Sequence, residues 1–416
     1  MRQQRINAFL VILLFFYHST VIVAQENSQG KNTLKAVKIL NTQKEVRRWE
    51  HLQPSSGANT CFLSLDKNEI VVRIDSEIQR LPLPNHFYNI VASRSGKYFA
   101  ILQLFPDKKG ENGNRQLHIS VYSANARPAY AVNVPLYSRD IIPFCLLSDR
   151  DGALILGESP IGRLVFYTAE GQVERTVNLF PDAEFDLERF LQIALSSDGE
   201  KIAVLASKRG ASPVDSDAPN PSGEPHLFLF NADGLERWNK PLPQSTPQNV
   251  AISPDGNSIL AAGYSSFLDG RVEKSTQLLG KNNTLVKSFS LLFRTVDFSP
   301  QTNQILLADR STIHQIDIRN GNVIREESFP SEEGLITSAR FNSTGSQIFI
   351  LTAQSRFESG RFIFQQPLLH ILDTKGAQIQ KLSFPDDDFF KPLLDVQNEQ
   401  VFIGFAHHLY RIEVQQ

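Results

Sequence analysis

The chain has 416 residues, of which 41% are hydrophobic and 21% charged, an ordinary composition for a globular protein. Lysine and arginine number 42 against 44 aspartates and glutamates, so the net charge is -2. Without a basic excess to neutralise phosphates, the composition argues against a nucleic-acid-binding protein. Only Cys61 and Cys145 are present, which excludes a zinc finger and a disulfide framework.

The N-terminus has the pattern of a secretory signal peptide. Arg2 and Arg5 supply positive charge, an apolar run follows over residues 8–16, and Ala24 is a small residue suited to precede a cleavage site. An uncleaved membrane anchor is the alternative. Because residues 17–20 interrupt the apolar run, it is short for a membrane span of about 20 residues.

These features divide the chain into three parts. We expect residues 1–24 to be a signal peptide, 25–32 a short linker and 33–416 one folded domain. The mature chain would have no membrane span, since no later segment is apolar enough. It would work in the periplasm or outside the cell.

One unit recurs from about residue 60 onward: an apolar strand, a turn of Ser, Pro, Asp, Asn and Gly, and a second apolar strand. In such turns Asp or Ser binds the backbone, and Gly or Asn accepts the positive φ that closes a hairpin. The clear copies cover residues 250–263, 193–205 and 339–351. Weaker copies centre on Asn68, Gly96, Gly152, Asn303 and Asn398, which makes eight units.

Many copies are followed by a second hairpin, so the repeating unit has four strands. Asn68 and Asn398 are seven steps apart, which gives a period of about 47 residues. This period is typical of a β-propeller blade. Segments such as residues 202–206 are apolar on both faces, as expected for a blade packed between two others. We predict an all-β protein: a single propeller of eight four-stranded antiparallel blades, with seven as the alternative.

Two segments carry a resemblance to known families. Ser253-Pro254-Asp255-Gly256 and its flanking strands resemble the YVTN and WD-repeat-like bacterial propellers. Residues 233–238 (Asp-Gly-Leu-Glu-Arg-Trp) resemble the outer hairpin of PQQ-type quinoprotein repeats. The chain lacks the Trp-Asp dipeptide and the regular Gly-His pair of eukaryotic-type WD repeats. We predict no cofactor, and we interpret Trp49 and Trp238 as packing residues of outer strands.

The way the ring closes can also be predicted. The last unit, from Pro392, stops one strand short. Residues 45–50 resemble the outer strand at residues 235–239, and we expect them to fill the vacant position and remove an exposed sheet edge. Residues 34–40 would be part of this closure or an extra strand. The first unit, residues 60–83, is short, which keeps the seven-bladed alternative open. Cys61 and Cys145 are expected on the first strands of the first and third units, with another blade between them, too far apart for a disulfide.

One face of the ring carries the unusual loops. Connections between second and third strands share a face with those that join blades, and long ones are expected at residues 105–116, 207–225, 264–274 and 354–365. Loops on a rigid scaffold commonly bind partners. Freely varying solvated turns are the alternative. We expect partner binding by acidic and aromatic residues of two blade-joining loops: Asp182, Glu184, Phe185 and Asp186, and Asp386, Asp387, Asp388, Phe389 and Phe390.

No catalytic or metal site is predicted. Asp386–Asp388 lacks the spaced pattern of a calcium loop. Histidines recur on third strands, which lie too far apart in neighbouring blades to share an ion at ligand distances of ~2 Å, so a structural role is expected. No Gly-x-Ser-x-Gly elbow or phosphate-binding glycine loop occurs. The recurrent histidines are His118, His226, His314, His370 and His408.

The sequence thus favours an exported, monomeric scaffold that binds a protein or a small ligand by one face. An enzyme (hydrolase, lyase or quinoprotein) with an axial active site is the alternative, and a subunit presenting one face to a larger complex is a third possibility. First strands rich in small, apolar or Ser residues favour the scaffold. An axial pocket with several inward-facing ionisable groups would favour the enzyme, whereas a filled channel would favour binding by a face.

Overall fold

The structure is a computed structural model. It describes residues 34–41, 46–52, 61–66, 69–74, 77–105, 115–136, 142–210, 223–358, 361–373, 375–389, 392–397, 400–406 and 408–414. The expected signal peptide, the linker and Phe390 lie outside these residues. No helix within them is long and apolar enough to cross a membrane.

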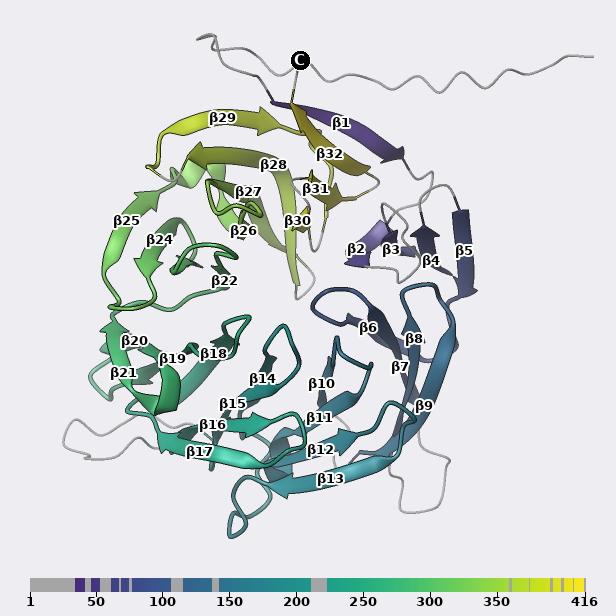
Figure 1. Ribbon diagram of the computed structural model, residues 1–416, viewed down its shortest axis with the longest axis vertical. Helices are drawn as coiled ribbons and strands as arrows, with labels where there is room; N and C mark the ends of the chain where they lie inside the picture. Colours follow the sequence, from purple (N-terminus) through teal and green to yellow (C-terminus); the bar gives the residue numbers. More distant parts are fainter. Residues whose placement is uncertain are drawn as a thin grey trace, which may run out of the picture.

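The chain forms a ring of eight antiparallel four-stranded sheets, which confirms the predicted eight-bladed propeller (Figure 1). From the innermost strand outward, blades one to four consist of β2 (Val46–Leu52), β3 (Cys61–Asp66), β4 (Glu69–Ile74) and β5 (Glu77–Pro82); β6 (Phe87–Ala92), β7 (Tyr98–Phe105), β8 (Gln116–Ser123) and β9 (Pro128–Pro135); β10 (Phe144–Leu147), β11 (Leu154–Glu158), β12 (Arg163–Tyr167) and β13 (Val173–Asn178); and β14 (Leu191–Leu195), β15 (Lys201–Ser207), β16 (Pro225–Asn231) and β17 (Glu236–Pro241).

The second half of the ring follows the same plan. Blades five to eight consist of β18 (Thr246–Ile252), β19 (Ile259–Ser266), β20 (Val272–Leu279) and β21 (Leu285–Phe289); β22 (Thr295–Phe298), β23 (Gln304–Ala308), β24 (Thr312–Asp317) and β25 (Val323–Ser328); β26 (Leu335–Phe341), β27 (Gln347–Glu358), β28 (Arg361–Asp373) and β29 (Gln378–Ser383); and β30 (Leu393–Gln397), β31 (Gln400–Phe405), β32 (His408–Val414) and β1 (Leu34–Asn41). Three short 3-10 turns are η1 (Ser159–Ile161), η2 (Lys281–Asn283) and η3 (Ser331–Glu333).

An N-terminal strand closes the ring, but residues 34–41 form it, which were expected only to be part of the closure or an extra strand, and residues 45–50 do not. β1 pairs with β32 from Leu34 opposite Val414 to Asn41 opposite His408, so it supplies the missing outer strand of blade eight. The predicted segment, residues 45–50, instead lies in β2 and pairs with β3 as the inner strand of blade one. The reason is that residues 60–83 contain only three strands, so blade one also needs a strand from upstream.

This arrangement corrects two related predictions. Trp49 lies on β2, the innermost strand of its blade, whereas Trp238 lies on an outer strand as expected. Cys61 lies on β3, a second strand and not a first strand. Cys145 lies on the first strand β10, with all of blade two between the two cysteines.

Apolar side chains between blades hold the ring together. All five residues of β11 are buried, as are six of the seven residues of β15. Both faces of these strands pack against sheets, which explains why the sequence is apolar on both sides. One cluster joins Phe166 of blade three to Val204 and Phe228 of blade four.

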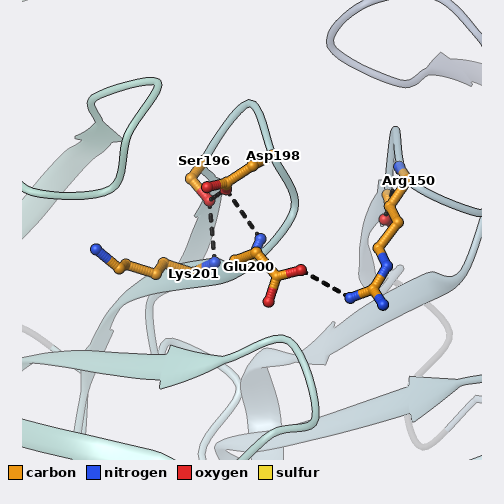
Figure 2. Close-up of polar contacts among 6 residues, drawn as sticks. Arg150, Ser196, Asp198, Glu200 and Lys201 are labelled. Carbon is orange, nitrogen blue, oxygen red and sulfur yellow. Dashed lines mark hydrogen bonds and ion pairs between the residues drawn. The ribbon is translucent and has the colours of Figure 1, made fainter.

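The repeated turns have the chemistry expected from the sequence. In blade four the Ser196 hydroxyl accepts a hydrogen bond from the Lys201 backbone N–H (2.9 Å), and Asp198 accepts one from that of Glu200 (3.0 Å) (Figure 2). Burial opposes ionisation of Asp198, but the Ser196 and Glu200 hydrogen bonds and the charge of Lys201 outweigh it and hold its pKa below 3.8. Glu200 then pairs with Arg150 of blade three at 2.7 Å, which links adjacent blades (Figure 2).

The connections divide between two faces. The loop face carries the second-to-third-strand and blade-joining connections, such as residues 179–190 and 384–389. The turn face carries the first-to-second and third-to-fourth-strand turns, such as residues 253–258 and 280–284. Two expected long loops are mostly strand instead: β19 pairs with β20 as far as Ser266 opposite Val272, and β27 with β28 as far as Glu358 opposite Arg361.

Candidate functional site

The two acidic and aromatic loops predicted to bind partners both lie on the loop face, but they differ in structure. In the loop between blades seven and eight, Asp386 accepts a hydrogen bond from the Gln366 backbone N–H at 3.2 Å. Asp387 lies 2.7 Å from the His408 ring, and Asp388 pairs with Arg356 at 2.6 Å. All three carboxylates therefore have partners within the chain.

Phe389 is also committed to the fold. Only 3% of it is exposed, and its ring stacks on Phe364 and packs against Phe405. Its backbone pairs with Phe364, so the loop fastens the β27–β28 hairpin to blade eight. Asp386–Phe389 consequently present little that a partner could bind without breaking existing contacts.

The 181–190 loop between blades three and four is anchored by a buried arginine. The Arg189 guanidinium donates to the Lys208 carbonyl (2.8 Å), the Pro160 carbonyl (2.7 Å) and the Glu184 carbonyl. Burial lowers the pKa of Arg189, and the charge of Asp186 opposes this effect. One cation thus ties the loop to η1 and to the end of β15.

Asp186 adds a second anchor from the acidic side. Its carboxylate accepts hydrogen bonds from the backbone N–H groups of Glu188 and Gly210, and its own N–H donates to the Pro160 carbonyl. Asp186, one of the predicted binding residues, therefore holds the loop in shape. Its neighbours are left to face solvent.

The rest of the loop projects outward. Phe185 is 51% exposed and Leu187 is 53% exposed. Asp182, Glu184 and Glu188 are exposed, and none forms an ion pair with any residue that the structure describes. The anchored loop thus presents two apolar side chains among three unpaired carboxylates.

An apolar hollow lies beside this loop, at the inner ends of blades two to four. Its volume is about 430 Å³, and we call it the Tyr88 hollow because the half-exposed Tyr88 forms part of its wall. Leu191 and Ser159, which flank the Arg189 anchor, also line it. Buried Cys145 lines it as well, and burial raises the pKa of its thiol to about 12, so the thiol is protonated and unreactive. The hollow can therefore receive an apolar side chain, and its cysteine is not a reactive nucleophile.

Two extended hairpins carry further apolar groups on the same face. Phe357 and Phe362, near the tip of the β27–β28 hairpin, are 67% and 54% exposed, and their rings contact each other. Leu268, at the tip of the β19–β20 hairpin, is 71% exposed. Three separate connections of the loop face therefore carry exposed apolar side chains.

A cluster of charged residues lies at the axis on the turn face, and it was not predicted from the sequence. Arg94, in the blade-two turn, reaches the Leu195 carbonyl of blade four (3.4 Å) and the Ile252 carbonyl of blade five (3.5 Å). Because these blades are not neighbours of blade two, the Arg94 side chain spans the axis. Burial lowers its pKa, partly offset by Asp297. Asp297 itself lies 3.8 Å from Arg340, and burial raises its pKa.

This axial cluster escaped sequence analysis for a definite reason. Arg94 lies in a turn, where charged residues are ordinary, and only its length carries it across the ring. Asp297 and Arg340 occupy the same position on the inner strands of blades six and seven, but most other inner strands have apolar or small residues there. A charged residue at a strand position that is apolar or small in most other blades could have identified Asp297 and Arg340 from the sequence.

The recurrent histidines all lie on third strands, as predicted, and contact different partners. His118 lies 2.7 Å from Asn133, His314 lies 3.3 Å from Glu326, and His408 contacts Asp387. His370 is buried beside Glu333, and His226 packs between Phe180 and Phe228. Among the described residues, no group of three or more His, Cys, Asp or Glu could hold a metal ion.

Solved structures of other proteins resemble this chain in fold at low sequence identity. A crystal structure of a eukaryotic initiation factor has a TM-score of 0.50 at 12% identity, covering 86% of this chain and 98% of that one. A structure of the Dos1 propeller has a TM-score of 0.45 at 12% identity, covering 70% and 72%. No family model and no curated protein sequence matches the chain. These likenesses concern the fold alone, and the sequence resemblance extends no further than a β-propeller.

Proposed function

We propose that this protein is an exported scaffold that binds a protein partner through its loop face. The observation that carries the proposal is the anchored 181–190 loop, which holds Phe185 and Leu187 in solvent beside the Tyr88 hollow. Exposed aromatic groups at rigid positions are frequent anchors of protein interfaces. Because Arg189 and Asp186 already order the loop, binding loses little conformational entropy there.

The charges around Phe185 and Leu187 indicate the surface chemistry of the partner. Asp182, Glu184 and Glu188 carry negative charge around the apolar pair, and none of them forms an ion pair within the described part of the chain. A complementary surface would place an apolar side chain in the Tyr88 hollow and Lys or Arg opposite the carboxylates. Such complementarity mainly accelerates association and makes it sensitive to salt.

A comparison of two double variants tests this proposal. Phe185→Ser with Leu187→Ser removes the apolar pair, whereas the control Val173→Ser with Leu235→Ser removes similarly exposed groups at third-to-fourth-strand turns. Quantitative mass spectrometry of proteins cross-linked to each variant in its native compartment should show a partner lost from the first and retained by the second. Loss from both, or retention by both, would reject the 181–190 loop as the binding site.

Export itself is part of the proposal and is supported by Arg2, Arg5 and the apolar run at residues 8–16. N-terminal sequencing of the protein from the cell's exported fraction should begin at Gln25. An intact N-terminus in a membrane fraction would indicate the anchor, and recovery from the cytoplasm would reject export.

The enzyme alternative rests on the axial cluster of Arg94, Asp297 and Arg340. Arg94 spans the axis and contacts carbonyls of two distant blades, which favours binding by a face over an open axial site. The resemblance of residues 233–238 to quinoprotein hairpins supports common ancestry with repeat propellers more than a shared reaction.

A further inference from the structure

A packing rule is repeated around the outer rim of the turn face. At four blade junctions, a glycine of the third-to-fourth-strand turn lies against the third residue of the preceding blade's outer strand. A Cβ atom added to that glycine would come within 2.0 to 2.8 Å of this side chain. The pairs are Gly171 on Tyr130, Gly234 on Arg175, Gly321 on Lys287 and Gly376 on Arg325.

Blade five breaks this rule. Its turn is the 3-10 segment η2, in which Asn282 and Asn283 both have positive φ angles of 61° and 66°. Gly280, the glycine of this turn, lies against Val286 and not against the third residue of β17, which is Trp238. The indole of Trp238 therefore lacks the glycine contact that these four junctions have.

A pocket of about 360 Å³ occupies the uncovered position, and we call it the Trp238 pocket. Trp238 and Arg237 line it from blade four, and Lys281 and Asn283 line it from the widened turn. This volume is near the lower end of the ~300–1,000 Å³ typical of small-ligand sites. A single ring with its substituents fits it better than a larger molecule.

The charged groups of the Trp238 pocket are all positive. Arg237 and Lys281 are exposed, and the only hydrogen bond from the Arg237 side chain among the described residues goes to Asn231 at 3.1 Å. Lys201 also lines the pocket but is already occupied, because its ammonium donates to the Asp255 and Gly256 carbonyls and to Asn257. Free cationic donors therefore come from Arg237 and Lys281.

An unused acceptor completes the site. Asn283 Oδ1 is buried, and no described residue donates a hydrogen bond to it. A buried acceptor without a hydrogen bond destabilises the free protein, and a hydroxyl donor from a ligand would relieve this cost.

We propose that the Trp238 pocket binds an anionic monosaccharide unit, a uronate or a sugar phosphate. The C–H groups on one face of a pyranose ring carry slight positive charge and would pack on the negative face of the indole. The acid group would pair with Arg237 and Lys281, and a ring hydroxyl would donate to Asn283. The pocket is on the turn face, so this proposal and the partner-binding proposal can fail independently.

Tryptophan fluorescence gives a direct test, because the chain has only two tryptophans. In a Trp49→Phe variant the signal comes from Trp238 alone, and isothermal titration calorimetry of the unaltered chain provides the same comparison should that variant not fold. Glucuronate or glucose 6-phosphate should bind saturably, and neutral glucose at least about tenfold more weakly, since it lacks the charge-assisted bonds. No saturable binding of either acid would overturn the proposal, and whichever acid binds tighter identifies the acid group.

Two further ligands separate the saccharide from other anions. Inorganic phosphate that binds as tightly as glucose 6-phosphate would show that the ring contributes nothing and would overturn the proposal. Adenosine monophosphate that binds more than about tenfold tighter than the sugar phosphate would do the same, in favour of a nucleotide.

A matched pair of variants locates the binding. Arg237→Gln should weaken glucuronate binding about tenfold or more. The control Arg319→Gln removes an exposed arginine of another third-to-fourth-strand turn, where it pairs with Asp317, and should leave binding unchanged. Equal effects of the two variants would place the sugar outside the Trp238 pocket.

Discussion

Two phenylalanines in similar loops should respond in opposite ways to the same substitution. Phe389 is 3% exposed and packs on Phe364 and Phe405, so Phe389→Ala opens a cavity between blades seven and eight. The loss of such a ring from a core costs about 3–5 kcal/mol. Phe185 is 51% exposed, so Phe185→Ala should change the free energy of unfolding by only about 0.5 kcal/mol.

Guanidinium chloride denaturation of the two variants and the unaltered chain measures both effects. The partner captured in cross-linking gives the complementary result, since Phe185→Ala should lose it while Phe389→Ala at low temperature should retain it. If Phe389→Ala lowers the free energy of unfolding by less than about 1 kcal/mol, the structural role assigned to its loop is refuted. If Phe185→Ala lowers the free energy of unfolding by more than about 2 kcal/mol, the claim that its ring is available to a partner is refuted.

Three further predictions follow from the fold. Deletion of residues 34–41 should expose the edge of β32 and cause concentration-dependent association, seen by light scattering, whereas deletion up to residue 33 should not. Burial lowers the pKa of His370, against the opposing charge of Glu333, so the unfolded chain gains the proton first. Stability should therefore fall as pH drops below about 6.5, and His370→Gln should flatten this part of the profile of denaturation midpoint against pH. In a Cys61→Ser variant, the pKa of about 12 for Cys145 implies roughly a thousandfold less thiolate at pH 8 than in the unfolded chain, so a thiol reagent should react only after denaturation.

Local sequence was sufficient for the number of blades and the turn chemistry. Turns such as Ser196–Lys201 depend on residues within five positions of one another, and the same pattern recurs around the ring. The choice of closing strand depends instead on which sheet edge is vacant. Residues 45–50 resemble an outer strand in composition, but the three strands in residues 60–83 left an inner position open, and β2 fills it.

The candidate site likewise depends on contacts between distant residues, which local sequence does not encode. The acidic loops at residues 182–188 and 386–390 look alike in sequence, and their described residues, 182–188 and 386–389, lie on the predicted face. Their roles differ because of distant partners. Arg356 and His408 bind carboxylates of one loop, whereas Arg189 binds only carbonyls in the other, where Asp182, Glu184 and Glu188 form no ion pair with a described residue. No local pattern encodes which basic residues the fold will bring to a loop.

Both proposed sites occur where the chain departs from its own repeat. A propeller satisfies each blade by the same contacts to its neighbours, so a regular junction has few groups left for anything else. At the junction of blades four and five, the turn η2 replaces a glycine turn, so the indole of Trp238 lacks a glycine against it, and the buried Asn283 oxygen receives no hydrogen bond from any described residue. At the junction of blades three and four, Arg189 supports a loop whose apolar side chains gain nothing from exposure in the free protein. Uncovered groups of this kind lower the stability of the free ring, and binding of a ligand or partner would recover that free energy.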